Sequence, residues 1–184
     1  GTTMLSDVLN ASTACVPMAV PYHMPEFYMI PACWSTYNTG HPSVTWASSV
    51  NPTNGYLYSA ATGSNNSIND WLITPAFVIP ATAQADSIML VYQIAGSTDS
   101  WSTNSAATYE LRISPDGGDL LTDFTDTLIT ESVNTNTFEF RRISMAQYAG
   151  DTVRFAFRST CAAYGMVGMT NFGIRSVLLP MYRS

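Results

Sequence analysis

The sequence predicts an all-β fold, an antiparallel β-sandwich of the jelly-roll type, and three observations lead to this prediction. Only 11% of the 184 residues are charged, which is roughly half the usual share. Ser, Thr and Asn supply the polarity instead, and their short side chains suit the solvent face of strands better than helices. Several segments alternate apolar and polar residues with a period of two, and turn residues separate them.

In the first half of the chain, short strands are expected at 43–47 and 56–60. The apolar segment 71–79 contains Pro75, which has no N–H to give to a sheet. This segment is therefore expected to be an edge strand or to be broken at a bulge. Residues 87–94 are apolar on both faces, which predicts a central strand that is covered on both sides.

The second half has the clearest alternation, in 107–114 and 152–159, where every second residue is apolar. Phe138 and Phe140 likewise alternate with charged residues, so they predict another strand. The turn signals between strands include Asn54-Gly55 and Pro115-Asp116-Gly117-Gly118. Two more strands are expected at 124–131 and 171–179, and single helical turns at 3–11 and 144–149.

The length fits one domain, expected at 14–184, with residues 1–13 as a leader or the end of a preceding segment. The net charge is −6, there is no lysine, and only seven arginines carry positive charge. Nucleic acids are bound through clustered Lys and Arg, so no nucleic-acid partner is expected. No apolar run approaches the ~20 residues that cross a bilayer, so no transmembrane segment is expected in this chain.

Three cysteines are present, Cys15, Cys33 and Cys161. Their spacing matches no zinc or redox motif. They are either unpaired buried thiols or one disulfide with one thiol left over, and the sequence does not choose the pair.

Three stretches of sequence together resemble a known family. They are 15–22 (CVPMAVPY) with 31–34 (PACW), then 69–75 (NDWLITP), and finally 148–158 (YAGDTVRFAFR) leading to the last strand. Over about residues 14–180 the chain is similar to the cleaved-adhesin, or choice-of-anchor J, domains of exported bacterial proteins. The familiar members are the adhesin domains attached to gingipain-type proteases.

The resemblance implies a jelly-roll sandwich of the galactose-binding or concanavalin-like type. It also implies a non-catalytic adhesion or binding role towards an extracellular protein or glycan. The chain would then be secreted or lie on the outer cell surface. The alternatives are a lectin-like carbohydrate-binding module and a structural spacer within a larger exported protein.

The resemblance further implies calcium sites that tie the first strand to the last. Here the chain departs from the family pattern, since Tyr28 and Arg175 stand where acidic residues are expected. Calcium needs several oxygen ligands, usually including carboxylates, and a guanidinium repels the ion. No cofactor is therefore expected, and Glu26 and Asp70 are the candidate ligands for a structural calcium ion.

Motifs for catalysis are missing from the sequence. His23 and His41 lie in loop-like segments without the Gly-x-Ser-x-Gly elbow that would hold a nucleophile. The acidic residues between 116 and 126 fit a solvated turn or a second calcium site better than the facing carboxyl pair of a glycosidase. We therefore predict that the chain is not an enzyme.

The tryptophans provide the candidate binding site. Trp34, Trp46 and Trp71 have apolar or small neighbours and are expected in the core. Trp101 instead stands in a polar loop, 96–105, where an exposed indole favours a ligand surface. Otherwise its ring folds back over the sheet edge. The predicted ligand-binding residues are Trp101, Asp99 and Asn104.

Overall fold

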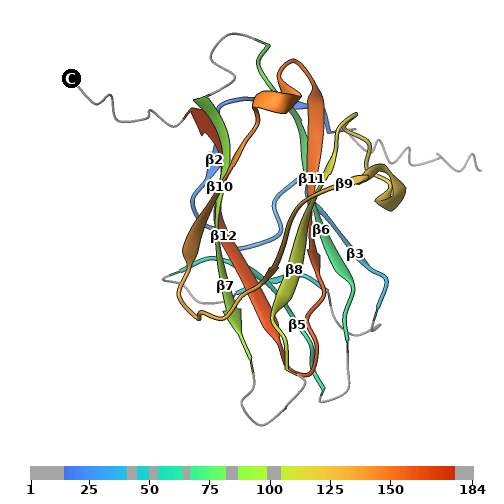
Figure 1. Ribbon diagram of the computed structural model, residues 1–184, viewed down its shortest axis with the longest axis vertical. Helices are drawn as coiled ribbons and strands as arrows, with labels where there is room; N and C mark the ends of the chain where they lie inside the picture. The colour runs from blue at the N-terminus through green and yellow to red at the C-terminus, as the bar shows by residue number, and fades with distance from the viewer. Residues whose placement is uncertain are drawn as a thin grey trace, which may run out of the picture.

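The structure is a computed structural model, and it describes residues 15–40, 45–49, 54–63, 67–81, 87–98 and 105–176. In this part of the chain the strands form two six-stranded sheets. The sheets pack face to face, and the strands of each form one layer of the sandwich (Figure 1). The all-β sandwich that the sequence predicts is confirmed.

Sheet A has the order β1-β6-β11-β8-β9, with β3 also paired to β6. Its strands are β1 (Met18–Ala19), β3 (Ser35–Asn38), β6 (Asp70–Val78), β8 (Thr108–Ser114), β9 (Asp126–Ser132) and β11 (Thr152–Ser159). Sheet B has the order β10-β7-β12-β5-β4, with β2 also paired to β12. Its strands are β2 (Tyr22–Met24), β4 (Ala47–Ser48), β5 (Leu57–Ala60), β7 (Ile88–Ser97), β10 (Glu139–Ser144) and β12 (Met166–Ser176).

From β5 onwards the chain changes sheet at nearly every connection, as in a jelly roll. Among the described residues, every strand pair is antiparallel except β1 with β6, which is parallel. The helical turn expected at 144–149 is the 3-10 helix η3 (Ala146–Tyr148), and a second, η2 (Leu121–Asp123), follows β8. The leader predicted at 1–13, with its helical turn at 3–11, lies outside the described residues.

Pro75 lies at a bulge, which is one of the two positions that the sequence predicts for it. The register of β6 with β11 shifts between Arg154 and Ala156, opposite Thr74 and Pro75. The strand is not an edge strand, because β1 and β3 pair with its other side. On that side β3 pairs with β6 up to Ile73, and β1 pairs with it from Phe77 onwards. Pro75 lies between these two paired stretches, where no partner strand needs a hydrogen bond from its nitrogen.

The prediction of a central strand at 87–94 is confirmed by β7, which lies between β10 and β12. Leu90, Tyr92 and Ile94 are fully buried on the core side. Val91 and Ala95, on the opposite face of the strand, are only 2% and 8% exposed.

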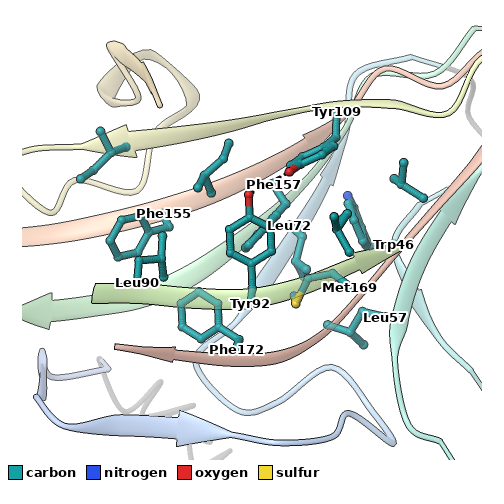
Figure 2. Packing of buried hydrophobic residues seen from close by; sticks show 14 of the residues in the cluster. Trp46, Leu57, Leu72, Leu90, Tyr92, Tyr109, Phe155, Phe157, Met169 and Phe172 are labelled. Atoms are coloured by element: carbon teal, nitrogen blue, oxygen red, sulfur yellow. Dashed lines mark hydrogen bonds between the residues drawn. The ribbon is translucent and has the colours of Figure 1, made fainter. Parts of the chain in front are cut away.

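Aromatic rings from both sheets fill the space between the layers, with Phe172 of β12 among them (Figure 2). Its ring centroid lies 5.1 Å from that of Trp34 and 5.9 Å from that of Phe77. Trp46 is also buried, and its indole N–H donates to the backbone oxygen of Asp70. Trp71 is buried as expected, but in a smaller cluster on sheet A that includes Phe124.

A bulge in β12 controls which of its side chains reach the core. The register with β7 shifts between Thr170 and Gly173, because β12 uses one extra residue there. Asn171 lies at this bulge with φ of 52°, a conformation that Asn tolerates better than most residues. The bulge resets the alternation, so four side chains on both sides of it are fully buried: Val167, Met169, Phe172 and Ile174.

In β10 a charged side chain faces inward and an aromatic side chain faces outward, which is the reverse of an ordinary amphipathic strand. Arg141 pairs with the core-facing Tyr92 of β7, whereas Phe140 pairs with Gln93 on the outer face. Phe140 is 46% exposed. Because β10 is an edge strand, the Arg141 side chain lies at the open side of the sandwich, where it binds Glu131 of β9. Inward-pointing charges of this kind are typical of protected sheet edges.

Cys15 and Cys33 form a disulfide, and Cys161 is a buried free thiol. This is the second of the two cysteine arrangements that the sequence allows. The disulfide joins the segment before β1 to the segment before β3, two strands of sheet A. The chain between the two cysteines includes β2 of sheet B, so the bond closes a loop that crosses from sheet A to sheet B and back.

Replacing both Cys15 and Cys33 by Ser is expected to lower the free energy of unfolding by about 3 kcal/mol, because the bond closes a loop in the unfolded chain. Urea unfolding of the wild type and the double variant measures this. Cys161→Ser is a poor control because its thiol is buried. The wild type with and without a reducing agent is the better comparison. Equal stability in both comparisons would contradict the assigned pairing.

Candidate functional site

The ligand-binding residues predicted from the sequence, Trp101, Asp99 and Asn104, lie outside the described residues, as does His41. They remain predictions. The described chain stops at Thr98, just after β7, and resumes at Ser105 before β8.

The two candidate calcium ligands lie in different environments. Glu26 is exposed and accepts a hydrogen bond from the hydroxyl of Tyr28, which raises the pKa of that phenol. Asp70 is fully buried, and its Oδ2 accepts a bond of 3.0 Å from the Ser59 hydroxyl. Within the described residues, no group of three or more His, Cys, Asp and Glu side chains is arranged to hold a metal ion.

The acidic residues between 116 and 126 lie along the connection from β8 to the first residue of β9. Asp116, Asp119 and Asp126 are not part of any such group, and Asp123 Oδ2 accepts from the backbone N–H of Leu120 at 2.9 Å. The carboxylate thus caps the short helix η2, which is a structural role typical of Asp in turns.

A groove runs over the outer face of sheet B. Its first part, the near lobe, has a volume of about 340 Å³, and a smaller hollow of about 100 Å³ continues from it. Tyr56 and Phe138 line both hollows. A third hollow of about 380 Å³ follows at Gly96 to Thr98, beside the segment 133–136. The β7 residues that line the three hollows run from Gln93 to Ser97, with Thr98 directly after them, and span about 17 Å at the usual strand rise of ~3.3 Å per residue.

Small residues on the two middle strands create the hollow. Ala95 of β7 pairs with Gly168 of β12, and both line the groove. A methyl group added at Gly168 would lie 3.2 Å from the Tyr56 ring and 3.5 Å from the Phe138 ring. The missing side chain is therefore what lets the two rings approach over the sheet.

Tyr56 and Phe138 approach each other from opposite sides of the groove, and their ring centroids are 5.3 Å apart. Tyr56 precedes β5 and Phe138 precedes β10, the strands that flank β7 and β12 in sheet B. Tyr58 adds a third ring, 6.1 Å from Tyr56. All three rings are half-buried, and Tyr56 and Phe138, which line the hollows, offer apolar faces to a ligand.

The near lobe adds polar groups beside the aromatic rings. Gln93, Thr170, Asn54, Thr137 and Glu26 line it together with Pro25, Gly55, Tyr56 and Phe138. The Thr170 hydroxyl is 2.8 Å from the backbone oxygen of Gly55 and 3.2 Å from that of Pro25. The single hydroxyl proton is shared between these two carbonyls, with the shorter bond to Gly55, and so holds both wall segments close to β12.

Glu26 is the only charged side chain among the described residues that line the three hollows. The groove thus combines aromatic faces, amides and hydroxyls with one carboxylate. The Glu26 carboxylate and the net charge of −6 would both repel an anionic ligand, so the groove suits a neutral one.

Sequence reasoning missed this groove, although its signals are present. Tyr56 and Tyr58 alternate with the buried Leu57 and Ser59, so their rings must face away from the core. Phe138 directly precedes β10, a strand in which Arg141 faces inward and Phe140 faces outward. Only the pairing of strands brings the two sets of rings together.

The fold and the groove together define a β-sandwich with a hollowed sheet face lined by aromatic and amide groups. No protein-family model matches the sequence, and no curated protein matches it. Among solved structures, the chain is similar to the K1 cleaved adhesin domain of Lys-gingipain from Porphyromonas gingivalis W83. The TM-score is 0.64 and the identity 19%, over 85% of this chain and 98% of that one. This likeness supports the fold that the sequence resemblance implied.

Two other solved structures share the fold. TmCBM61, solved in complex with β-1,4-galactotriose, has a TM-score of 0.53 at 10% identity, over 83% of this chain and 92% of that one. The glycoside hydrolase domain of Endo-D from Streptococcus pneumoniae R6 matches with a TM-score of 0.53 at 12% identity, over 79% of this chain but 22% of that one. At these identities the likeness concerns the fold alone.

Proposed function

We propose that this chain is a non-catalytic extracellular binding module that recognises a neutral glycan through the groove of sheet B. The observation that carries the proposal is the pair of Tyr56 and Phe138 rings over a floor of Ala95 and Gly168, next to the amide of Gln93. Sugars present apolar C–H faces and hydroxyl edges, so a binding site needs apolar surface together with a few placed polar groups.

A protein ligand is the second candidate, in line with the cleaved-adhesin resemblance. The groove favours a glycan because half-buried rings line small hollows beside an amide, whereas a protein interface needs a broad patch. The structural likeness to TmCBM61, which was solved with a galactotriose, supports the same choice. The length of about 17 Å along β7 suits an oligosaccharide chain rather than a single sugar.

The lining of the groove also supports a binding role over hydrolysis. Glycoside hydrolysis uses two carboxyl groups that flank the scissile bond. Among the described lining residues there is one carboxylate, Glu26. We therefore propose a role in binding and not in catalysis.

An extracellular location is supported by the Cys15–Cys33 disulfide, since such bonds persist mainly in oxidising compartments. The described part of the chain contains no helix that is long and apolar enough to cross a membrane. We propose that the module is secreted or displayed on the outer cell surface.

A glycan array together with a set of extracellular matrix proteins, probed with and without calcium, tests the proposed function. We expect a glycan to bind and Tyr56→Ala or Phe138→Ala to weaken it by about tenfold or more, because each removes a ring from the centre of the site. Tyr37→Ala is the matched control. This tyrosine is 45% exposed on β3 of the opposite sheet, and its loss is expected to leave binding unchanged.

The same assay separates the two candidate sites. If Trp101→Ala abolishes binding while Tyr56→Ala does not, the ligand site is the 96–105 loop predicted from the sequence, and the groove proposal is wrong. Binding to matrix proteins alone would favour the protein-binding alternative. No binding to either panel would favour the structural spacer.

A further inference from the structure

We propose that Asn171 is a specificity-determining positioning residue: it fixes the Gln93 amide so that its Nε2 donates into the near lobe, which then selects a ligand with a hydrogen-bond acceptor. This inference rests on the proposed function of the groove. It deepens that function because it states which kind of ligand atom the polar part of the site requires.

A chain of three hydrogen bonds crosses sheet B at the bulge of β12. His23 Nε2 lies 2.6 Å from Asn171 Oδ1, and Asn171 Nδ2 lies 3.0 Å from Gln93 Oε1. Gln93 Nε2 in turn lies 3.3 Å from the backbone oxygen of Phe138. The chain thus begins on β2, passes through β12 and β7, and ends at the aromatic wall of the groove.

The direction of every bond in this chain follows from its last member. The Phe138 oxygen is a backbone carbonyl and only accepts, so Gln93 must direct Nε2 towards it. Gln93 Oε1 then faces Asn171, which must donate from Nδ2. Asn171 Oδ1 must therefore accept, and His23 must carry a proton on Nε2. The network of partners thus sets the orientation of both amides.

The bond to Phe138 uses one of the two N–H groups of Gln93 Nε2 within the described part of the chain. Gln93 and Phe138 both line the near lobe, so the remaining N–H is the donor that Gln93 offers beside the aromatic wall. A ring oxygen, a hydroxyl or an acyl carbonyl of a glycan satisfies it, whereas an ammonium group does not.

The backbone around Asn171 shows why this residue is suited to the position. Its φ of 52° lies in the left-handed region that Asn and Asp tolerate better than most side chains. Its backbone N–H donates to the oxygen of Pro25 at 3.1 Å, so the bulge also fixes the wall that carries Glu26. The extra residue of the bulge in β12 thus places the Asn171 amide next to Gln93 on the outer face of sheet B.

Two substitutions separate the side chain from the backbone. Asn171→Asp keeps the acceptor for His23 but replaces the Nδ2 donor by a carboxylate oxygen, so Gln93 must turn its Nε2 away from the Phe138 wall. Asn171→Gly keeps the left-handed backbone but removes the side chain, so the Gln93 amide is released without being reversed.

The experiment records the side-chain amide signals of Gln93 in 15N-labelled protein, residues 1–184, first without ligand. We expect two well-separated, slowly exchanging Gln93 proton signals in the wild type. They should shift in Asn171→Asp and exchange faster in Asn171→Gly. Identical Gln93 signals in the wild type and Asn171→Gly would overturn the inference, whatever the protein binds.

The same samples are then titrated with β-1,4-galactotriose, cellotriose and mannotriose. A trisaccharide that binds in the groove should move the Gln93 Nε2 signals and bind about fivefold to tenfold more weakly to Asn171→Asp, the loss expected for one hydrogen bond. Binding at Tyr56 and Phe138 with equal affinity for wild type and Asn171→Asp would overturn the inference and leave the proposed function intact. If neither the trisaccharides nor the array glycans bind, the glycan function and the selection of an acceptor both fail, and the ligand-free spectra still decide the Asn171–Gln93 contact.

Discussion

Phe172→Ala is expected to lower the free energy of unfolding by about 4 kcal/mol, the cost of removing a large ring from a packed core. The ring is fully buried and lies between five others, those of Tyr22, Trp34, Phe77, Phe155 and Phe157. Its removal leaves a cavity that neither sheet can close and breaks several edge-to-face contacts. Since domains of this size are stable by only about 5–15 kcal/mol, urea unfolding should show a large fall in the transition midpoint.

Phe140→Ala is the matched control for this prediction. The same ring is removed, but from the outer face of β10, where it is 46% exposed and lies beneath the guanidinium of Arg142. We expect a loss of about 0.5 kcal/mol. Losses of similar size for the two variants would mean that Phe172 does not occupy the centre of the core.

Glu131→Gln is expected to lower the free energy of unfolding by about 2 kcal/mol near neutral pH, because it weakens the bridge that closes the open side of the sandwich. Glu131 on β9 accepts bonds of 2.5 and 2.9 Å from Arg141 on β10, so the two edge strands of opposite sheets are joined. Its Oε2 also accepts from the Tyr109 hydroxyl at 2.9 Å. Both side chains are about three-quarters buried, so solvent screens the pair only partly.

The bridge continues into the core through two tyrosines. Tyr109 gives its only hydroxyl proton to Glu131, so in the 2.8 Å contact between the two hydroxyls Tyr92 must be the donor. Figure 2 shows these hydroxyls facing each other across the layers. Burial raises the pKa of both phenols, which keeps them protonated and able to donate.

The contribution of Glu131 depends on pH. The hydrogen bonds from Arg141, and to a lesser extent from Tyr109, hold the pKa of this carboxyl below its usual 4.5 in the folded state. The unfolded chain then binds the proton more readily, so the stabilisation is fully present above about pH 4.5. It is lost as the pH falls through the lowered pKa of the folded protein.

Urea unfolding of the wild type and Glu131→Gln, repeated from about pH 7 down to about pH 3, tests this dependence. The difference in stability between the two proteins should shrink on acidification, because the other carboxyls contribute equally to both. Glu139→Gln is the control. It also contacts Arg141, but at 3.5 Å with a side chain 53% exposed, and a change of about 0.5 kcal/mol or less is expected. A pH-independent difference for Glu131→Gln would contradict the bridge.

Several elements could be predicted from the sequence because their signals are local. The alternation in 107–114 and 152–159 follows directly from the period of a strand with one buried face. The continuous apolar character of 87–94 indicates a strand with both faces covered, and β7 is central in sheet B. Pro75 lacks an N–H wherever it lies, so a bulge in β6 was one of the two arrangements open to it.

The edge strand β10 shows what a local pattern cannot decide. Its alternation predicts a strand but does not say which face lies inside. An inward arginine is favourable there because Glu131, ten residues earlier in the chain, accepts its hydrogen bonds across the open side of the sandwich. Phe138 and Phe140 consequently lie on the outer face, and the groove acquires one of its walls from residues that would otherwise be assigned to the core.

The all-β architecture follows from the amino-acid sequence alone, because charge content, period-two patterns and turn residues act over a few neighbouring positions. The sequence also limited the cysteines to two arrangements, but the choice of Cys15 with Cys33 required their approach in space. The groove depends on the tertiary structure, since Tyr56, Gln93 and Phe138 come from three separate strand regions. So does the bulge at Asn171, because an extra residue in one strand is recognised only against the register of its partner.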